Sequence, residues 1–366
     1  MAGHGLQIDG ADGRHQHGAV NDDPIPTPAA AGYTMPAEWE PHAACLMSWP
    51  SRVELWGDRL ADAKRDYAAV AAAIAAFEPV IMVCNPGTID EVSTTCGPGI
   101  VPIEIPINDS WSRDNGPVFV RNAAGQVAVV GFGFNAWGNR WHPHDDDARL
   151  PHRIAQWLEL PFFDAPFVLE GGSFFVDGEG TVITTEQCLL NPNRNPHLSR
   201  AQIEQGLKSY LGATTVIWLP FGHSLDTGPA GTDGHIDGVL QFASPGRVLL
   251  EVVSDPTSPE FARGRANLDR LNASRDAVGR VIEVAILDPG PDASVSYANH
   301  YLANGAVIVP LAGDDTDGPA CETLQALHPD RTIVGVPGTT LAAGGGGPHC
   351  ITQQVPHGVP IPGAPA

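Results

Sequence analysis

The fold is indicated most directly by residues 299–309, which read NHYLANGAVIV. Asn-Gly between two apolar runs is a strong β-hairpin signal, because both residues tolerate the left-handed backbone of a tight turn. A helix-like segment at 319–328 and another apolar run at 333–336 follow. This part of the chain therefore predicts one ββαβ unit that opens with a polar residue, Asn299.

The same order recurs along the chain, about five times in all, with openings near 45, 114, 170, 235 and 299. The expected helices lie at 58–77, 149–159, 199–211, 259–273 and 319–328. In the first of them, Tyr67, Val70 and Ile74 share one face at helical spacing. The expected third strands lie at 80–83, 167–169, 216–219, 281–284 and 333–336. Such a period is typical of radial repeat architectures with an α/β composition.

A radial arrangement has a consequence for function. If every hairpin starts at a common axis, the polar residues that open the units meet at one end of the molecule, although they are far apart in sequence. These residues are Asp114, Glu170, His235, Asp237, Asn299 and Cys350.

Composition limits the kind of partner. The net charge of −22 argues against nucleic acid and fits a cationic small molecule. Apolar runs are too short for a membrane span, and no basic-then-apolar signal opens the chain. Six cysteines stand scattered, without CxxC pairs. This pattern disfavours a metal-cysteine or disulfide framework and predicts a reducing cytoplasm.

The N-terminal residues differ from the rest in composition. Residues 1–32 hold few large apolar side chains and are expected to form a disordered tail, with residues 33–366 as one catalytic domain. His4, His15 and His17 offer weak metal ligands, but a solvated tail without that role is the favoured interpretation.

Cys350 follows the glycine run 344–347 and precedes a short strand-like segment. Glycines let other groups approach the backbone closely, so the thiol is placed where a substrate can reach it. Most free cysteines are small buried apolar residues. The polar clusters upstream favour the other interpretation, a catalytic nucleophile.

A thiol, a histidine and several carboxylates together suggest chemistry on a guanidinium group. Carboxylates such as Asp114 and Asp237 pair bidentately with a planar cation and polarise its central carbon. Cys350 is then the expected nucleophile, and His235 the group that moves protons.

Alternatives exist for single members. Asp114 fits a turn in WSRDNGP (111–117), and Glu170 before two glycines fits a loop. His142 and His144, ahead of three aspartates, suggest a metal site, but a solvated loop and helix start is favoured.

His349 adjoins Cys350, but neighbours in an extended chain point to opposite sides, so His235 is preferred as the base.

Trp111 and Trp137 have two interpretations. They are either core residues or aromatic platforms on which a bound cation stacks.

Several motifs run in order from about residue 33 to the end: MPAEWEP (35–41), WSRDNGP (111–117), FNAWG (134–138), EGGS (170–173), TEQCLLN (185–191), GHID (234–237), SYAN (296–299) and HCITQQ (349–354). In these motifs the chain resembles the agmatine deiminases. They are members of the guanidino-group-modifying superfamily, which has the pentein fold, a five-bladed α/β propeller of ββαβ units with pseudo-fivefold symmetry. Bacterial-type peptidylarginine deiminases are related to them.

The resemblance implies hydrolysis of agmatine to N-carbamoylputrescine and ammonia, a step in putrescine biosynthesis, without metal or organic cofactor. It implies that Cys350 attacks the guanidinium carbon and that Asp114 and Asp237 hold the guanidinium. His235 transfers protons, and Glu170 orients His235. A supporting role for Asn299 is implied more weakly. Homo-oligomers are common in this family.

The chain departs from the family pattern at three places. It has Gly347-Pro348 where Asn-Ile is usual, Ser112 where Met is common, and His300 where Phe is common. These positions line or flank the expected pocket, so another guanidine such as peptidyl-arginine stays open as the substrate. A guanidine-binding protein without activity stays open as well. An arginine free to pair with a substrate carboxylate would favour arginine-like substrates, and Arg113 and Arg140 are the candidates.

Overall fold

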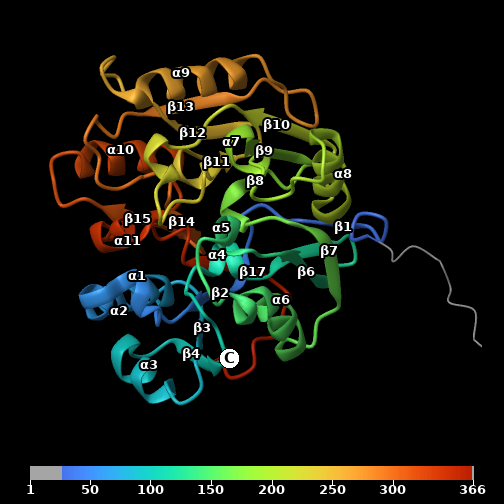
Figure 1. Cartoon of the computed structure of the whole chain (residues 1–366), viewed down its shortest axis with the longest axis vertical. Coiled ribbons are helices and arrows are strands. Elements are labelled where there is room, and N and C mark those ends of the chain that lie inside the picture. The colour runs from blue at the N-terminus through green and yellow to red at the C-terminus, as the bar shows by residue number, and fades with distance from the viewer. Residues whose placement is uncertain (1–26, 365–366) are drawn as a thin grey trace, which may run out of the picture.

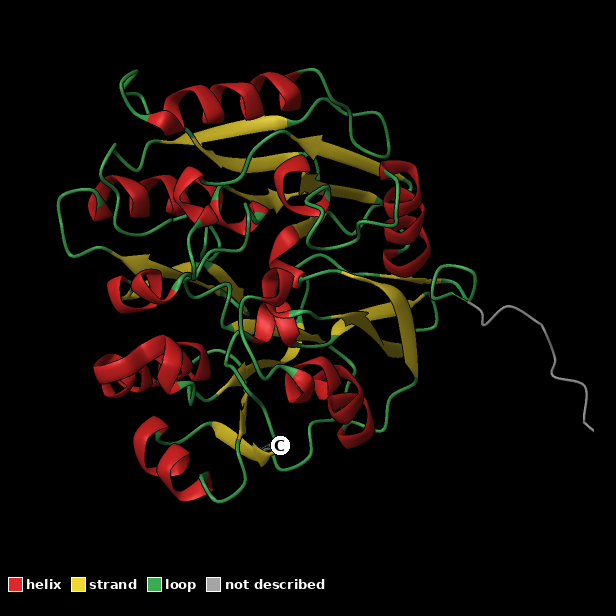
Figure 2. Cartoon of the chain, viewed as in Figure 1, coloured by secondary structure: helices red, strands yellow, loops and turns green. Residues whose placement is uncertain are grey.

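Five small β-sheets, arranged around a common centre, make up the computed structural model, which describes residues 27–364 (Figure 1). The longer helices lie on the outside, and the strands lie further in (Figure 2). His4, His15 and His17 lie outside the described residues. None of the helices within residues 27–364 is long and apolar enough to span a membrane.

The unit expected from residues 299–309 forms as predicted. β14 (Tyr301–Ala303) and β15 (Ala306–Leu311) pair antiparallel, and Gly305 in the turn has φ 78°. α10 (Asp317–Leu327) then leads to β16 (Thr332–Pro337), which pairs parallel with β15. A helix supplies the crossover that a parallel neighbour needs.

Three further sheets repeat this order of hairpin, helix and parallel strand. The first comprises β5 (Val118–Asn122), β6 (Val127–Gly133), α6 (Asp145–Trp157) and β7 (Phe162–Val168). The second comprises β8 (Phe174–Val176), β9 (Thr181–Thr185), α8 (Arg200–Leu211) and β10 (Thr215–Leu219). The third comprises β11 (Leu240–Ser244), β12 (Arg247–Glu251), α9 (Pro259–Asn272) and β13 (Glu283–Leu287).

The fifth sheet joins the two ends of the chain. β17 (Thr352–Pro356) pairs antiparallel with β2 (His42–Ser48), which pairs parallel with β3 (Val80–Cys84) after α2 (Leu60–Ala75). The predicted opening near residue 45 is therefore wrong. Cys45 lies in the second strand of its sheet, opposite Gln354, because the first strand comes from the other end of the chain. This sheet opens after Cys350.

Several elements were not predicted. β4 (Ile100–Glu104), which follows the helix α3 (Ile89–Cys96), extends the fifth sheet, and β1 (Tyr33–Thr34) pairs with β5. Short helices occupy connections: α1 (Val53–Trp56), η1 (Gly57–Arg59), α4 (Ser112–Asn115), α5 (Ala136–Asn139), η2 (Gly171–Ser173), α7 (Glu186–Leu189), η3 (Ser224–Thr227), η4 (Ile236–Gly238) and α11 (Thr339–Gly344). Of the expected tail, residues 1–26 lie outside the described part. Residues 27–32 form a turn in which the Ala29 amide donates to the Ser209 carbonyl (3.0 Å).

Two expected strands were misplaced by a few residues: 167–169 is the end of β7, and 281–284 lies ahead of most of β13. The predicted face of α2 is confirmed, because Tyr67, Val70 and Ile74 are fully buried in one apolar cluster. Burial of such a face, at about 25 cal/mol per Å², drives the helix onto the sheet.

Candidate active site

The segments just before the five first strands meet in one place. The Gly172 amide donates to Asp114 Oδ1 (2.9 Å), which links the segment before β5 to the one before β8. Asn299 Nδ2 donates to the Asp237 carbonyl (3.1 Å) and lies 3.1 Å from Cys350 Sγ. The structure therefore brings together residues from all five sheets, as the radial arrangement predicted.

Cys350 lies against glycine backbone that leaves room for it. A Cβ added to Gly346 would come within 3.0 Å of Sγ and 2.6 Å of the Trp111 ring. A Cβ on Gly347 would lie 2.6 Å from Asn299 Oδ1. The glycines thus permit the close approach that the sequence indicated, and the 5%-exposed thiol lines a cavity.

The Cys350 thiol is surrounded by acceptors and acids. Its Sγ lies 3.4 Å from Asp237 Oδ2 and 3.4 Å from Asn299 Oδ1. Burial, together with the charges of Asp237 and Asp114, raises the pKa of Cys350 well above its ordinary value. The thiol is therefore protonated at neutral pH.

Asp114 is held from both sides. Its Oδ2 accepts a hydrogen bond from Trp137 Nε1 (2.9 Å), and its Oδ1 accepts the Gly172 amide. Burial raises the pKa of Asp114 to about 6, with His235 opposing the shift and Asp237 and Glu170 adding to it. The carboxylate is ionised at neutral pH and fixed in direction.

Trp137 reaches Asp114 from an unusual backbone. Ala136, Trp137 and Asn139 have φ between 51° and 62°, in the left-handed region that side chains rarely adopt. Strain of this kind concentrates at functional sites. Trp111, by contrast, stacks on Trp56 with ring centroids 5.9 Å apart. Both predicted tryptophans are nearly buried and border a small hollow that Asp114 and Cys350 also line.

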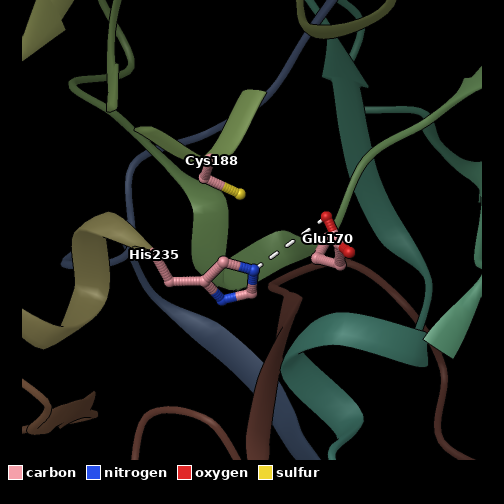
Figure 3. A group of neighbouring side chains, drawn as sticks. All are labelled: Glu170, Cys188 and His235. Atoms are coloured by element: carbon pink, nitrogen blue, oxygen red, sulfur yellow. Dashed lines mark ion pairs between the residues drawn. The ribbon is translucent and has the colours of Figure 1, made fainter. Parts of the chain in front are cut away.

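His235 lies between two carboxylates. Its Nδ1 is 3.7 Å from Asp114 Oδ1, and its Nε2 is 3.9 Å from Glu170 Oε2, toward which the ring points (Figure 3). Burial alone lowers the pKa of His235, but the negative groups around it, Asp114 foremost, raise it well above its ordinary value. The imidazole is therefore protonated at neutral pH.

Glu170 is anchored by an arginine that the sequence analysis did not single out. Arg194 Nε donates to Glu170 Oε1 (2.6 Å), and its Nη1 donates to Asp233 Oδ2 (2.8 Å). Both Arg194 and Glu170 are buried. Arg194 lies in the polar segment NPNRNP (191–196), which begins at the last residue of the TEQCLLN motif. Its position next to this motif was the only sequence feature that could have suggested a role for it.

Cys188, on α7, adds a thiol beside His235 and Glu170 (Figure 3). One ligand-type atom from each of the three lies within 4.8 Å of the others, a set of the kind that binds zinc. Burial raises the pKa of Cys188, so this thiol is protonated. His142 and His144 belong to no such three-residue group within residues 27–364. His144 directly precedes α6, as the favoured interpretation had it.

His349 does not face the thiol. Its Nδ1 contacts Asp237 Oδ2 (2.8 Å), and its Nε2 contacts Glu38 Oε2 (3.0 Å). Burial lowers the pKa of His349, but Glu38 and Asp237 outweigh this and raise it. In turn, burial raises the pKa of Asp237 while His349 lowers it, and the net pKa lies below the ordinary value. Glu38 and His349 thus keep Asp237 ionised, a role missed because Glu38 is remote in sequence.

The reaction centre opens into a cavity of about 750 Å³. His235, Asp237, Asn299 and Cys350 line it. Its other walls come mainly from three connections, at 222–232, 289–296 and 342–347, and from residues between 251 and 267, at the end of β12 and on α9. Of the three departures from the expected pattern, Gly347 lines the cavity, whereas the buried side chain of Ser112 bonds to Ser48 Oγ (2.8 Å) and that of His300 to the Tyr297 carbonyl (2.8 Å).

Comparison with known proteins agrees with this architecture. The family model of the Porphyromonas-type peptidyl-arginine deiminases matches residues 34–356. Agmatine deiminase of Pseudomonas aeruginosa is 42% identical over 367 residues, with 91% of this chain and 98% of that protein covered. The agmatine deiminase of Stutzerimonas stutzeri is 41% identical over 367 residues, with 90% and 97% covered.

A solved structure of agmatine deiminase of Enterococcus faecalis superposes with a TM-score of 0.86 at 36% identity, covering 91% of this chain and 98% of that one. The predicted five-bladed α/β propeller, the pentein fold, is confirmed. The chain therefore belongs to the Porphyromonas-type peptidyl-arginine deiminase family, and agmatine deiminases are among its relatives.

Proposed function

We propose that this protein hydrolyses agmatine to N-carbamoylputrescine and ammonia. The observation that carries the proposal is the Cys350 thiol in one buried cluster with two carboxylates: its Sγ lies 3.4 Å from Asp237 Oδ2, and Asp114 lies 3.7 Å from the ring of His235. This arrangement suits a guanidinium group: the two carboxylates can hold the planar cation while the thiol sulfur attacks its central carbon. The agmatine deiminases among its relatives support agmatine as the guanidine.

In the proposed binding step, the two aspartates pair with guanidinium nitrogens, and Trp111 and Trp137 flank the planar cation. Asn299 holds the thiol in place through its 3.1 Å contact with Sγ. The cation itself lowers the pKa of Cys350, because it offsets the two carboxylates that raise it. The thiol proton is then released to solvent, so the nucleophilic thiolate forms only when substrate is present.

The first chemical step forms a bond between Sγ and the guanidinium carbon and breaks one terminal C–N bond. The departing nitrogen takes a proton from His235 and leaves as ammonia, and the enzyme retains a thiouronium on Cys350. Water then attacks the same carbon and gives one proton to His235. The C–S bond breaks, the leaving sulfur takes up the second water proton to restore the thiol, and the neutral carbamoyl product leaves. Glu170, anchored by Arg194, orients the His235 ring throughout.

The arginines near the site support agmatine over arginine as the substrate. Arg113 pairs with Gln354 Oε1 (2.7 Å) and lies 3.6 Å from Glu38 Oε2. Arg140 pairs with Asp233 and the Gly231 carbonyl. Both candidates for binding a substrate carboxylate are therefore occupied. Peptidyl-arginine deimination is the second candidate, supported by the family model and by the likeness to a solved structure described as a peptidyl-arginine deiminase.

The proposal is tested by ammonia release from agmatine, with arginine, a blocked peptidyl-arginine and plain guanidine measured alongside. We expect release from agmatine above all others. Release from another guanidine alone would keep the chemistry and replace the substrate. Tight agmatine binding without release would favour the non-catalytic alternative.

Addition of a chelator is expected to leave the rate of ammonia release unchanged. Inactivation that added metal reverses would contradict a cofactor-free reaction.

The activity is expected to depend on pH through Asp114. Its pKa, raised to about 6 by burial, means that the carboxylate is charged above that pH and neutral below it. Guanidinium binding needs the charged form, so kcat/KM should fall as pH drops below about 6. A kcat/KM profile over the acid and neutral range checks this. A flat profile would contradict the role given to Asp114.

Replacing His235 by glutamine should lower kcat by about 10²- to 10⁴-fold, the usual contribution of a general acid–base. The exposed His152 on α6 provides the matched control, because His152→Gln changes the same chemistry outside the cavity. Steady-state ammonia release checks both variants. An unchanged rate in His235→Gln would mean that another base acts, with His349 the nearest candidate.

Other properties stay predictions. A cytoplasmic location is supported by the free state of all six cysteines, Cys45, Cys84, Cys96, Cys188, Cys321 and Cys350. A homo-oligomer is expected from the family. The proposal that residues 33–366 form one catalytic domain is supported by the site, which takes residues from all five sheets.

A further inference from the structure

The cavity continues beyond the reaction centre and contains charged groups that the chemistry does not use. These are Asp226, Glu251, Glu260, Arg263 and Asp292. A substrate with a cationic arm needs an anionic partner at this end of the cavity. The question is which of these carboxylates is free to provide it.

Two of these carboxylates already have partners. Asp226 accepts hydrogen bonds from the amides of Thr232 (2.7 Å) and Gly234 (2.9 Å), which fold the connection over the site. Glu260 Oε1 accepts the Ser224 amide (2.8 Å), and Glu260 Oε2 lies 3.8 Å from Arg263 Nε.

Arg263 itself is occupied, because it donates to the Gly222 carbonyl and to Gln187. Asp292 is exposed, so water screens its charge.

Glu251, the last residue of β12, is different. Its Oε1 accepts the Ala298 amide (2.8 Å) and the Ser296 hydroxyl (3.2 Å), which fixes the carboxylate. Within residues 27–364, no lysine, arginine or histidine forms an ion pair with Glu251, and its hydrogen bonds come only from the Ser296 hydroxyl and from the backbone at Tyr297 and Ala298. Burial raises the pKa of Glu251 to about 7, as expected of a carboxylate that lacks a cation.

The same contacts place Glu251 next to the reaction centre. The residue after Ala298 is Asn299, whose Nδ2 lies 3.1 Å from Cys350 Sγ. Ser296 Oγ also donates to the carbonyl of Gly238 (3.0 Å), the residue after Asp237. Glu251 and Cys350 therefore contact adjacent residues, Ala298 and Asn299, and both line the cavity. A substrate that reaches both groups would lie along this wall.

We propose that Glu251 is the binding site for the distal ammonium group of the substrate, with Oε2 as its acceptor. The inference rests on the proposed function, because it assumes a guanidinium bound at Cys350. It assigns the selection of substrates to two points: the aspartates select the guanidinium, and Glu251 selects a primary ammonium at the other end of a four-carbon chain. An arginine-like carboxylate near that end would be repelled.

The test compares agmatine with pentylguanidine, which has a methyl group in place of the ammonium. In Glu251→Gln, Oε1 still accepts its two hydrogen bonds, so the wall keeps its shape. We expect the ratio of kcat/KM for agmatine to that for pentylguanidine to fall about 10- to 100-fold, chiefly through the KM of agmatine. Glu260→Gln, at a carboxylate already occupied, should leave this ratio unchanged. An unchanged ratio in Glu251→Gln would overturn the proposal.

A binding measurement separates this inference from the proposed function. Calorimetry with the Cys350→Ala variant gives the Kd of agmatine and of pentylguanidine without turnover. Adding Glu251→Gln should weaken the binding of agmatine about 10- to 100-fold and leave the binding of pentylguanidine unchanged. If the binding of both ligands weakens equally, or if neither changes, the assignment of Glu251 as the ammonium site is wrong, even if the enzyme hydrolyses agmatine. If the selective loss appears in an enzyme that releases no ammonia, the site stands and the proposed function fails.

Discussion

The Cys350→Ala variant is expected to lose at least about 10⁴-fold in kcat for ammonia release, because no other thiol in the described part of the chain lines the cavity. The Cys350 sulfur contacts Asn299 and Asp237. The Cys188 thiol lies elsewhere, beside His235 and Glu170. The side chain removed is small, so the fold should persist. Ammonia release and thermal unfolding of the same sample check the two expectations.

Cys321→Ala is the matched control, since Cys321 lies on α10, outside the cavity, and loses the same atom. It should retain its activity. Full activity in Cys350→Ala would contradict covalent catalysis at this residue. Loss of activity accompanied by loss of the folding transition would be a folding effect, and Cys350→Ser would then decide between the two explanations.

Gly172→Ala should have the second largest effect. An added Cβ would lie 2.7 Å from His235 Nδ1, 2.8 Å from Asp114 Oδ1 and 2.8 Å from Asp237 Oδ2. Three groups with proposed roles would have to move, and displacements near 1 Å cost about 10²-fold in rate. We expect a loss of this size or more in kcat/KM for agmatine.

The control for Gly172→Ala is Gly318→Ala. Gly318 lies in α10, and an added Cβ there meets nothing within 4 Å. Alanine favours helix over glycine by about 1 kcal/mol, so this variant should be slightly more stable and fully active. Equal activity of the two alanine variants would show that the three side chains do not need their present positions.

The sequence predicted the parts of the fold that depend on neighbours along the chain. The Asn304-Gly305 turn and its flanking apolar runs are local signals, and the hairpin they predict is present. The buried face of α2 follows from helical spacing alone. Residues that open the units could be predicted to converge because each hairpin begins at the same end of its sheet.

Long-range partners could not be predicted in this way. The pairing of β17 with β2 joins the two ends of the chain, so the unit near Cys45 was given the wrong opening. Arg194 and Glu38 act on Glu170 and His349 through contacts that cross sheets. The left-handed backbone at Trp137 is imposed by tertiary structure, since the residue type itself disfavours it.

The covalent intermediate provides the most direct test of the central claim, that Cys350 attacks the guanidinium of agmatine. The wild-type enzyme is mixed with agmatine, quenched in acid at a series of times, digested and examined by mass spectrometry. The account predicts that the peptide containing Cys350 gains the mass of agmatine less one ammonia during turnover, and that this adduct is absent in Cys350→Ala. Continued ammonia release with Cys350 unmodified at every quench time, or with the adduct on another residue, would contradict it.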